Sequence, residues 1–358
     1  MYSASSMRAS TQDVPSALAS TALAFPEFRE RAPWWGGDLQ TLRNTLVPVD
    51  APLTDGVAES LLLDLNDGSG DRLVAQLQQP VLASERPCIV LIHGLGGDEK
   101  SSYLKASAHF WLARGYRVLR LNLRGAGPSR AICRFQYHAG KSEDVYAALE
   151  SLCSQRPEIA RAGLAIVGFS LGGNVTLKFA SEGVGDLPVK AVASVSAPID
   201  LALASRRLHE PRNRVYLWYL LRRLRREAVG SGAQLSAAER EVALTARTIL
   251  EFDDRFVAPR GGFSGVEDYY AQSSALPRLA AIRIPALAIH ALDDPWIPAA
   301  MYSRLNAVEA ASPEPVAGIR VLLPPGGGHV GFHAWPRGSK GGGWHDQCIG
   351  VFFDRVFA

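Results

Sequence analysis

The chain has 358 residues, of which 47% are hydrophobic and 20% charged, and its formal net charge is +3 at pH 7. This composition is that of a globular protein, and it excludes a wholly disordered, collagen-like or coiled-coil chain. The small positive excess argues against nucleic acid as a partner, because nucleic-acid-binding proteins usually carry a strong basic footprint. No apolar run approaches the ~20 residues that a membrane-spanning helix needs.

The cysteines and the first residues bear on the compartment. The cysteines show no C-x-x-C spacing, so the sequence gives no support for a zinc site or a dithiol redox motif. Their sparse use fits a reducing compartment. No positive segment followed by an apolar one opens the chain, so we expect no secretory signal and a cytoplasmic protein. We expect residues 1–30 to form a loose lead-in. The cysteines are Cys88, Cys133, Cys153 and Cys348.

The predicted elements change character along the chain. Val57–Leu65 and Leu73–Gln78 alternate apolar and polar residues, as half-buried antiparallel strands do. Continuous apolar runs follow, typical of parallel strands buried on both faces: Cys88–Ile92, Val118–Leu123, Leu164–Gly168, Val189–Val195, Ala286–Ile289 and Ile319–Leu323. Helical patterns lie between them: Ser101–Arg114, Ser142–Gln155, Leu171–Glu182, Ala299–Ala310 and Trp344–Phe357. This alternation predicts an α/β fold with a mostly parallel sheet and helices on both faces.

One interval breaks the alternation. About 90 residues separate the sixth strand from the seventh, many more than a crossover helix needs. We therefore expect a helical lid inserted at 200–272, after the sixth strand. The lid would divide the core into a first part at 31–199 and a second part at 273–358.

The predicted lid contains a basic amphipathic helix, Val215–Arg226. Asp200–Arg260 contains 12 Arg, no Lys and 8 acidic residues, so the small positive excess of the chain resides there. At helical spacing, Leu217, Leu220, Leu221 and Leu224 share one face, and Arg222, Arg223, Arg225 and Arg226 lie mostly on the other. One interpretation is a lid helix packed on the sheet domain with a solvated basic face. The other is contact with a membrane surface or anionic lipid.

The pattern Gly168-Phe169-Ser170-Leu171-Gly172 lies between an apolar strand and a helix, which is the context of a nucleophile elbow. A strand that turns at once into a helix forces the central serine into a strained conformation. Side chains two positions to either side would clash, so both positions require glycine. The turn directs the hydroxyl of Ser170 outward at a helix N-terminus, where negative charge is favoured.

A serine nucleophile needs a base, and we expect His329 to supply it. His329 follows the last apolar strand in a glycine-rich loop, at the edge of the sheet where ligands bind. His333 and His345 are rivals further along the chain. His290, at the end of its own strand, is better interpreted as a core residue or a supporting one.

An acid must orient the base, and two neighbouring carboxylates follow the strand Ala286–Ile289. Asp294 heads the turn D-x-x-x-P that leads into the next helix, so we favour it as the acid and interpret Asp293 as a loop or capping residue. The order Ser, Asp, His, with each residue at a strand end, is the α/β-hydrolase arrangement.

Attack on a carbonyl creates an oxyanion that needs two donors. We expect one to be the N–H of Leu171. The other should come from the loop His93-Gly94-Leu95-Gly96-Gly97, with Leu95 as donor and His93 and Gly94 in support. The same loop resembles a phosphate-binding Walker loop, but Glu99 stands where that motif needs glycine, and its carboxylate would repel phosphate.

His138 and Asp144 could form a second acid–base pair. His138 precedes a predicted helix, and Asp144 lies near the start of that helix. Both residues are more simply interpreted as shaping the start of this helix, with Ser142 as its cap and Asp144 in its first turn.

The chain resembles the YheT-like α/β-hydrolases from about Arg31 to its C-terminus. The stretches that carry the resemblance are Pro33–Thr41, His93–Asp98, Asn122–Gly127, Tyr137–Gly140, Gly168–Asn174, Phe252–Phe256, Asp268–Tyr270, Asp293–Pro295 and Gly328–His329. The resemblance implies a Ser170–Asp294–His329 triad and hydrolase activity, most simply on carboxylic esters. The chain departs from the family pattern at Gly37-Asp38 and in its arginine-rich lid.

These observations predict a serine hydrolase that cleaves acyl or lipid-like esters through an acyl-enzyme, with neither a metal nor an organic cofactor. The same triad serves thioesterases and acyltransferases. A lipid-binding or membrane-surface protein with vestigial activity is the alternative from another class. The sequence carries no signal of the oligomeric state.

Overall fold

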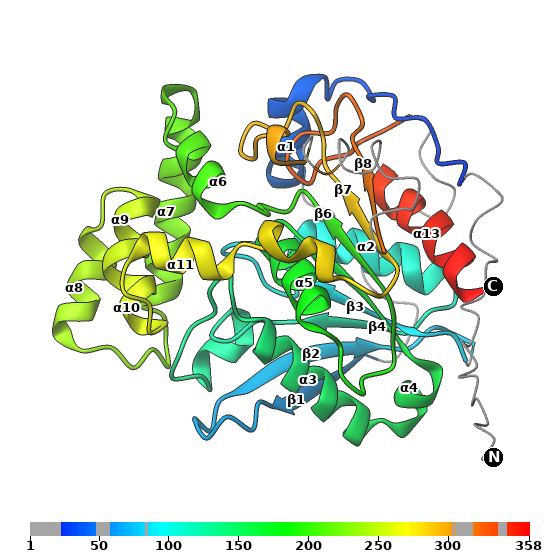
Figure 1. Ribbon diagram of the computed structural model, residues 1–358, viewed down its shortest axis with the longest axis horizontal. Coiled ribbons are helices and arrows are strands. Elements are labelled where there is room, and N and C mark those ends of the chain that lie inside the picture. The colour runs from blue at the N-terminus through cyan, green and yellow to red at the C-terminus, as the bar shows by residue number, and fades with distance from the viewer. Residues whose placement is uncertain (1–22, 48–57, 83–84, 303–304, 306–317, 336–341) are drawn as a thin grey trace, which may run out of the picture.

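The computed structural model describes residues 23–47, 58–82, 85–302, 305, 318–335 and 342–358. Its centre is a sheet of eight strands in the order β1-β2-β4-β3-β5-β6-β7-β8 (Figure 1). The strands are β1 (Ala58–Asp64), β2 (Arg72–Gln78), β3 (Cys88–Ile92), β4 (Val118–Leu121), β5 (Leu164–Phe169), β6 (Val189–Val195), β7 (Ala286–Ile289) and β8 (Ile319–Leu322).

Strand direction follows the change in sequence pattern. The alternating strands β1 and β2 pair antiparallel, and β2 also pairs antiparallel with β4. From β4 to β8 all neighbours are parallel. The side chains of β3, β4, β5 and β7 are all buried, as expected for strands covered on both faces. Because these strands are parallel, their carboxyl ends meet at one edge of the sheet.

Helices cover both faces of the sheet. On one face, α3 (Ser142–Gln155) and α5 (Leu171–Glu182) contribute to one apolar core, with α4 (Pro157–Ala162) beside α3. On the other face, α2 (Ser102–Ala113) and α13 (Trp344–Phe357) contribute to a second core. An N-terminal helix that the sequence analysis missed, α1 (Gly36–Leu46), lies near α2. The expected helix Ala299–Ala310 falls largely outside the described residues.

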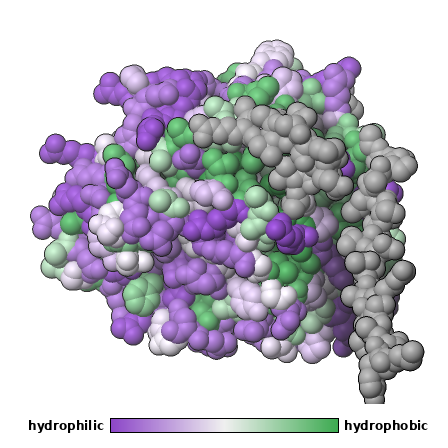
Figure 2. All heavy atoms as spheres, in the orientation of Figure 1, coloured by the Kyte–Doolittle hydropathy of each residue, from purple (hydrophilic) through white to green (hydrophobic). Residues whose placement is uncertain are grey.

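The segment between β6 and β7, which we call the insertion (200–272), is helical. Its helices are α6 (Leu201–Leu208), α7 (Arg214–Ala228), α8 (Ala237–Thr245), α9 (Ile249–Phe252), α10 (Ala258–Arg260) and α11 (Val266–Ser273), with a π-helical turn at Asp253–Val257. Leucines of α7 and aromatic residues near α9 form a separate small core. The surface over the insertion in Figure 2 is mainly hydrophilic. In the described part of the chain, no helix has the length and apolar character needed to cross a membrane.

The structure corrects the expected arrangement of arginines on α7. Leu220, Leu221 and Leu224 are buried, as the amphipathic pattern predicts. Arg222 and Arg226 are exposed. Arg223 and Arg225 are only half-exposed, because their guanidinium groups turn back to donate hydrogen bonds to backbone carbonyl oxygens of the protein. The basic face is therefore partly an internal contact surface.

A second correction concerns the start of α3. Lys141 is the N-cap residue and makes no capping hydrogen bond with its side chain. Ser142 is instead the first helical residue, and its hydroxyl donates to a carboxylate oxygen of Glu182, 2.5 Å away. Asp144 does lie in the first turn, where it pairs with Arg124. Its role is therefore structural rather than that of a general acid.

Candidate active site

The turn from β5 to α5 has the strained geometry expected of a nucleophile elbow. Ser170, between the two elements, has a φ of +52°, which is unusual for any residue other than glycine. A Cβ at Gly168 would lie 2.3 Å from the carbonyl oxygen of Gly172. A Cβ at Gly172 would lie 2.4 Å from the carbonyl oxygen of His93. Both glycines are therefore required by the space around the turn.

Three side chains from the ends of different strands form one hydrogen-bonded series. Nε2 of His329 lies 2.8 Å from Oγ of Ser170, and its Nδ1 lies 2.9 Å from Oδ2 of Asp294. Asp294 and His329 are buried, whereas Ser170 remains partly accessible. A neutral imidazole that donates from Nδ1 to the carboxylate presents an acceptor at Nε2 to the serine hydroxyl. The three residues thus have the arrangement that activates a serine.

The other carboxylate oxygen of Asp294 fixes the acid in place. Oδ1 accepts hydrogen bonds from the backbone N–H groups of Trp296 (2.8 Å) and Ile297 (3.0 Å). Burial by itself would raise the pKa of Asp294. The charge and hydrogen bond of His329, together with the nearby His290 and the N–H of Trp296, outweigh burial and hold the pKa below its usual value. Asp294 is therefore a carboxylate at neutral pH.

The loop that carries His329 is held from two sides. The backbone N–H of His329 donates to Oγ1 of Thr41 on α1 (2.8 Å). The N–H of the next residue, Val330, donates to Oγ of Ser196 (3.1 Å). The indole of Trp296 stacks on the imidazole, with ring centroids 4.3 Å apart. Thr41 and Trp296 were not singled out from the sequence. Thr41 lies in the stretch Pro33–Thr41 that carries part of the family resemblance, which is the only signal that pointed toward it.

The rival residues lie elsewhere. His290 is buried, stacks on Tyr302, and has its Nδ1 4.0 Å from Asp294, which fits a supporting position. Burial lowers the pKa of His290 to about 4, so it is neutral. Asp293 accepts a hydrogen bond from the N–H of Gly328 (2.9 Å), as a loop residue does. His345 packs against Phe169 and Asp346. His333 donates its backbone N–H to the side chain of Gln40, 2.7 Å away.

Two backbone N–H groups are available beside Ser170. Across the described residues, no hydrogen bond from the N–H of Leu95 or of Leu171 to a protein atom is found. A Cβ at Gly94 would lie 2.8 Å from Cβ of Ser170, so only glycine allows this loop to approach the serine so closely. Leu171 occupies the first position of α5, where backbone N–H groups are free and the helix dipole favours negative charge.

His93 holds the carbonyl side of the same loop. Its Nδ1 lies 2.8 Å from the carbonyl oxygen of Gly94, and its Nε2 accepts from the N–H of Leu123 (3.1 Å). Burial lowers the pKa of His93 to about 4, so the ring is neutral and its Nδ1 carries the proton. The hydroxyl of Tyr103 accepts from the N–H of Gly94 (2.9 Å). These contacts hold the loop beside Ser170, and the supporting role expected of His93 and Gly94 stays a prediction.

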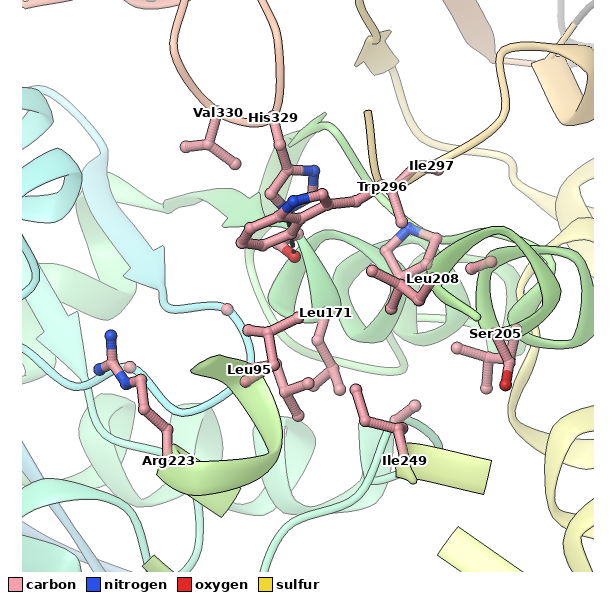
Figure 3. Close-up of a pocket in the computed structure, with 18 of the residues that line it drawn as sticks. Leu95, Leu171, Ser205, Leu208, Arg223, Ile249, Trp296, Ile297, His329 and Val330 are labelled. Carbon is pink, nitrogen blue, oxygen red and sulfur yellow. Dashed lines mark hydrogen bonds between the residues drawn. The ribbon is translucent and has the colours of Figure 1, made fainter. Parts of the chain in front are cut away.

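Ser170 opens into a cavity of about 190 Å³ between the sheet edge and the insertion. In Figure 3, Trp296 lies over His329, and apolar side chains point into the space beside them. Polar side chains also line the cavity, among them Asp253. Asp253 accepts a hydrogen bond from the hydroxyl of Tyr270 (2.7 Å), and burial raises the pKa of its carboxyl group to about 7. Apolar lining residues include Leu95, Leu171, Leu208, Leu220, Ile249 and Ile297.

The departure from the family pattern at Gly37-Asp38 has a structural reason. A Cβ at Gly37 would lie 2.0 Å from the carbonyl oxygen of Asp293, so glycine lets α1 approach the loop of the acid. Oδ1 of Asp38 accepts from the hydroxyl of Tyr216 (2.9 Å), and its Oδ2 from Arg212 (3.0 Å). Asp38 therefore ties α1 to the insertion.

The pair His138 and Asp144 does not form a second acid–base site. Both oxygens of Asp144 accept from the guanidinium of Arg124, at 2.7 and 2.8 Å, and both side chains are buried. Burial lowers the pKa of His138 to about 3, and its Nδ1 accepts from the N–H of Gly140 (3.1 Å). The structural interpretation of this stretch is therefore the better one.

Comparison with known proteins shows the family of the chain. The profile of a family described as alpha/beta hydrolase fold matches residues 87–334. YheT of Escherichia coli (strain K12) is 34% identical over 276 residues, which are 75% of this chain and 77% of that protein. Phospholipase ABHD3 of Homo sapiens is 29% identical over 279 residues, which cover 77% of this chain but 63% of the human protein.

The fold also matches solved structures. An esterase of Pyrococcus furiosus superposes with a TM-score of 0.58 at 16% sequence identity, covering 87% of this chain and 96% of that one. At this identity the likeness concerns the fold alone. From the family profile and the relative in Escherichia coli, the chain belongs to the α/β-hydrolase fold family and is of the YheT-like type.

Proposed function

We propose that the chain hydrolyses carboxylic esters of acyl or lipid-like substrates, with Ser170 as nucleophile, His329 as base and Asp294 as the acid that orients it. The observation that carries this proposal is the hydrogen-bonded series Asp294–His329–Ser170, which opens into an apolar cavity beside two free N–H groups. Relatives in Homo sapiens and Saccharomyces cerevisiae are by name a phospholipase and a monoacylglycerol lipase.

In the proposed reaction, Oγ of Ser170 attacks the ester carbonyl carbon and its proton passes to Nε2 of His329. The carbonyl oxygen becomes an oxyanion that accepts hydrogen bonds from the N–H groups of Leu95 and Leu171. Collapse breaks the ester bond, and the leaving alkoxide takes the proton from His329. Water then attacks the acyl-enzyme by the same route and releases the acid. This chemistry requires neither a metal nor an organic cofactor.

We further propose that the insertion serves as a lid over the acyl group. Leu208, Leu220 and Ile249 come from its helices and line the cavity that contains Ser170. An acyl chain placed among these side chains would leave water, which favours substrates with an apolar acyl part. The core at 31–199 and 273–358 would then supply the chemistry, and the insertion would set the acyl length.

The first test is hydrolysis of p-nitrophenyl esters with acyl chains from C2 to C12. Ser170→Ala should abolish hydrolysis and labelling by a fluorophosphonate, because both need the serine hydroxyl. Ser181→Ala, on the same helix and facing away from the cavity lining, is the matched control and should retain both. Full activity in Ser170→Ala would refute the assignment of the nucleophile. If the fluorophosphonate did not label the wild-type protein, the proposal that the chain is a serine hydrolase would be refuted.

Thioester hydrolysis and acyl transfer are the alternatives within the same site. Both use the same acyl-enzyme, and they differ in the leaving group and in the acceptor that removes the acyl group. Acyl-CoA analogues in place of oxygen esters test the first. Analysis of products in the presence of a primary alcohol tests the second, since transfer yields a new ester and hydrolysis yields the free acid.

A membrane surface is the second candidate partner. The outward side of α7 carries Trp218 and Val215, residues that are 61% and 74% exposed. Beside them lies a surface groove with four arginines: Arg214, Arg222, Arg225 and Arg247. Exposed Trp218, Arg214 and Arg222 lie together on one side of α7, which fits peripheral contact with anionic lipid. Such contact would bring lipid esters to the cavity.

A further inference from the structure

The loop that carries Leu95 is a tight turn that the insertion holds from outside. The N–H of Gly97 donates to the carbonyl oxygen of Gly94 (3.0 Å) and closes the turn around Leu95 and Gly96. Gly96 has a φ of +64°, which glycine adopts without strain. The N–H of Leu95 is a free donor beside Ser170, so the orientation of this turn decides where that donor points.

Both peptide groups of Gly96 are linked to α7, the one directly and the other through Tyr137. Its carbonyl oxygen accepts a hydrogen bond from the guanidinium of Arg223. Its N–H donates to the hydroxyl oxygen of Tyr137 (2.8 Å), which in turn donates to Oε2 of Glu227 (3.0 Å). Arg223 and Glu227 lie one helical turn apart on the same side of α7. In Figure 3, Arg223 extends from this helix beside the loop of Leu95.

Glu227 occupies a position where a carboxyl group is costly. Burial raises the pKa of Glu227 to about 7, although the hydrogen bond from Tyr137 and the charges of Arg223 and Arg130 oppose the rise. Asp98, whose backbone adjoins the same turn, raises it further. An apolar residue would bury this part of α7 without that cost. The carboxyl group of Glu227 accepts a hydrogen bond from the hydroxyl of Tyr137, a contact that an apolar residue could not make.

We propose that Arg223 and Glu227 are positioning residues for catalysis: from α7 they fix the two peptide groups of Gly96, and thereby hold the N–H of Leu95 toward the oxyanion. This inference rests on the proposed ester hydrolysis. The oxyanion hole is then complete only while the insertion packs against the core. The insertion then does more than line the cavity, since it completes the catalytic machinery.

Tyr137→Phe tests the inference with the smallest change, because it removes only the hydroxyl between Gly96 and Glu227. We expect kcat for p-nitrophenyl esters to fall about tenfold with KM unchanged, because a misplaced donor weakens binding of the transition state and not of the ester. Glu227→Ala should cause a similar loss. Glu227→Gln should restore most of kcat, because the amide oxygen still accepts the tyrosine proton.

A double-mutant cycle shows whether Glu227 acts through Tyr137. In the Tyr137→Phe background, Glu227→Ala should cause no further loss of kcat, because the link is already broken. Tyr146→Phe on α3 and Glu241→Ala on α8 are matched controls, and both should retain the wild-type kcat. Thermal unfolding of each variant separates a loss of kcat from a loss of folded protein.

The inference is overturned if Tyr137→Phe keeps the wild-type kcat, if the loss appears in KM alone, or if the losses of Tyr137→Phe and Glu227→Ala multiply. Failure of the proposed function has a different signature, since the wild-type protein itself would then show no hydrolysis that depends on Ser170. The two failures are thus distinguished by the wild-type measurement in the same assay.

Discussion

At the scale of single residues, the two oxygens of Asp294 have separate tasks. Oδ1 accepts hydrogen bonds from two backbone N–H groups of the turn that follows, so the carboxylate cannot rotate. Oδ2 faces Nδ1 of His329. This division fixes both the position of the imidazole and its tautomer. A side-chain amide in the same place would still accept the two backbone hydrogen bonds through its oxygen. Its N–H group would donate to Nδ1 of His329 and so reverse the direction of that hydrogen bond.

Asp294→Asn is therefore expected to keep the fold and lose the catalysis. The asparagine oxygen can still accept from Trp296 and Ile297, but its amide would donate to Nδ1 of His329. The imidazole proton would then reside on Nε2, which could no longer accept the proton of Ser170. We expect kcat for ester hydrolysis to fall by about 10³–10⁴, with a melting temperature close to that of the wild type.

Asp293→Asn is the matched comparison, because this neighbour is the rival acid in the sequence. It should retain most of the activity, since an asparagine oxygen can still accept from Gly328. If Asp293→Asn lost activity and Asp294→Asn did not, the assignment of the acid would be wrong.

At the scale of elements, the turn from β5 to α5 requires positions without side chains, because backbone atoms lie close on both sides. Gly172 lies against the carbonyl oxygens of Ile92 and His93 at the end of β3. A side chain there would push α5 away from the very loop that carries Leu95. The glycine thus links the position of the nucleophile to the position of the oxyanion donor.

Gly172→Ala should lower the free energy of unfolding by about 1–3 kcal/mol, because its Cβ would lie 2.4 Å from a backbone oxygen and neither element can yield freely. Chemical denaturation measures this change. Gly350→Ala in α13 is the control: its Cβ would meet only side chains, the ring of Phe110 at 3.3 Å and the guanidinium of Arg114 at 3.6 Å. A helical alanine gains up to about 1 kcal/mol over glycine. Equal destabilisation of the two variants would refute the steric explanation of the elbow.

The elements near the site differ in how well their sequence reveals them. The apolar runs at β5, β7 and β8 predict parallel strands, and the ends of these strands place Ser170, Asp294 and His329 at one edge. The helix α1 has no such pattern, because little of it is buried and its contacts are polar. Its contribution, the hydroxyl of Thr41 under His329, depends on a contact between residues 288 positions apart.

At the scale of the whole molecule, the sequence predicts the helical insertion but not how it is attached. Long-range contacts decide that attachment: Asp38 with Tyr216, Arg223 with Gly96, and Tyr137 with Glu227. Each joins residues 90 or more positions apart, and periodicity carries no information on such pairs. The arginines of α7 illustrate the consequence. Their spacing predicts one basic face, whereas the fold turns two of them inward and leaves the others to solvent.

This division separates the two roles proposed for α7. Arg223 faces the catalytic loop, whereas Arg222 lies outward over the ring of exposed Trp218, 5.6 Å from its centroid. We expect the wild-type protein to sediment with vesicles that contain anionic phospholipid. A double variant, Trp218→Ser with Arg222→Gln, should bind them several-fold less, because it loses one aromatic anchor and about 1 kcal/mol of attraction to the charged surface.

Arg240→Gln, which removes an exposed arginine from α8, is the control for net charge and should bind vesicles as the wild type does. Salt distinguishes the two contributions, because ~0.5 M salt screens the arginine but not the burial of the indole. Binding that is equal for the wild type and the double variant would refute membrane contact through this side of α7. If the wild-type protein bound neutral vesicles equally well, the indole of Trp218, and not the charge of Arg222, would be the membrane anchor.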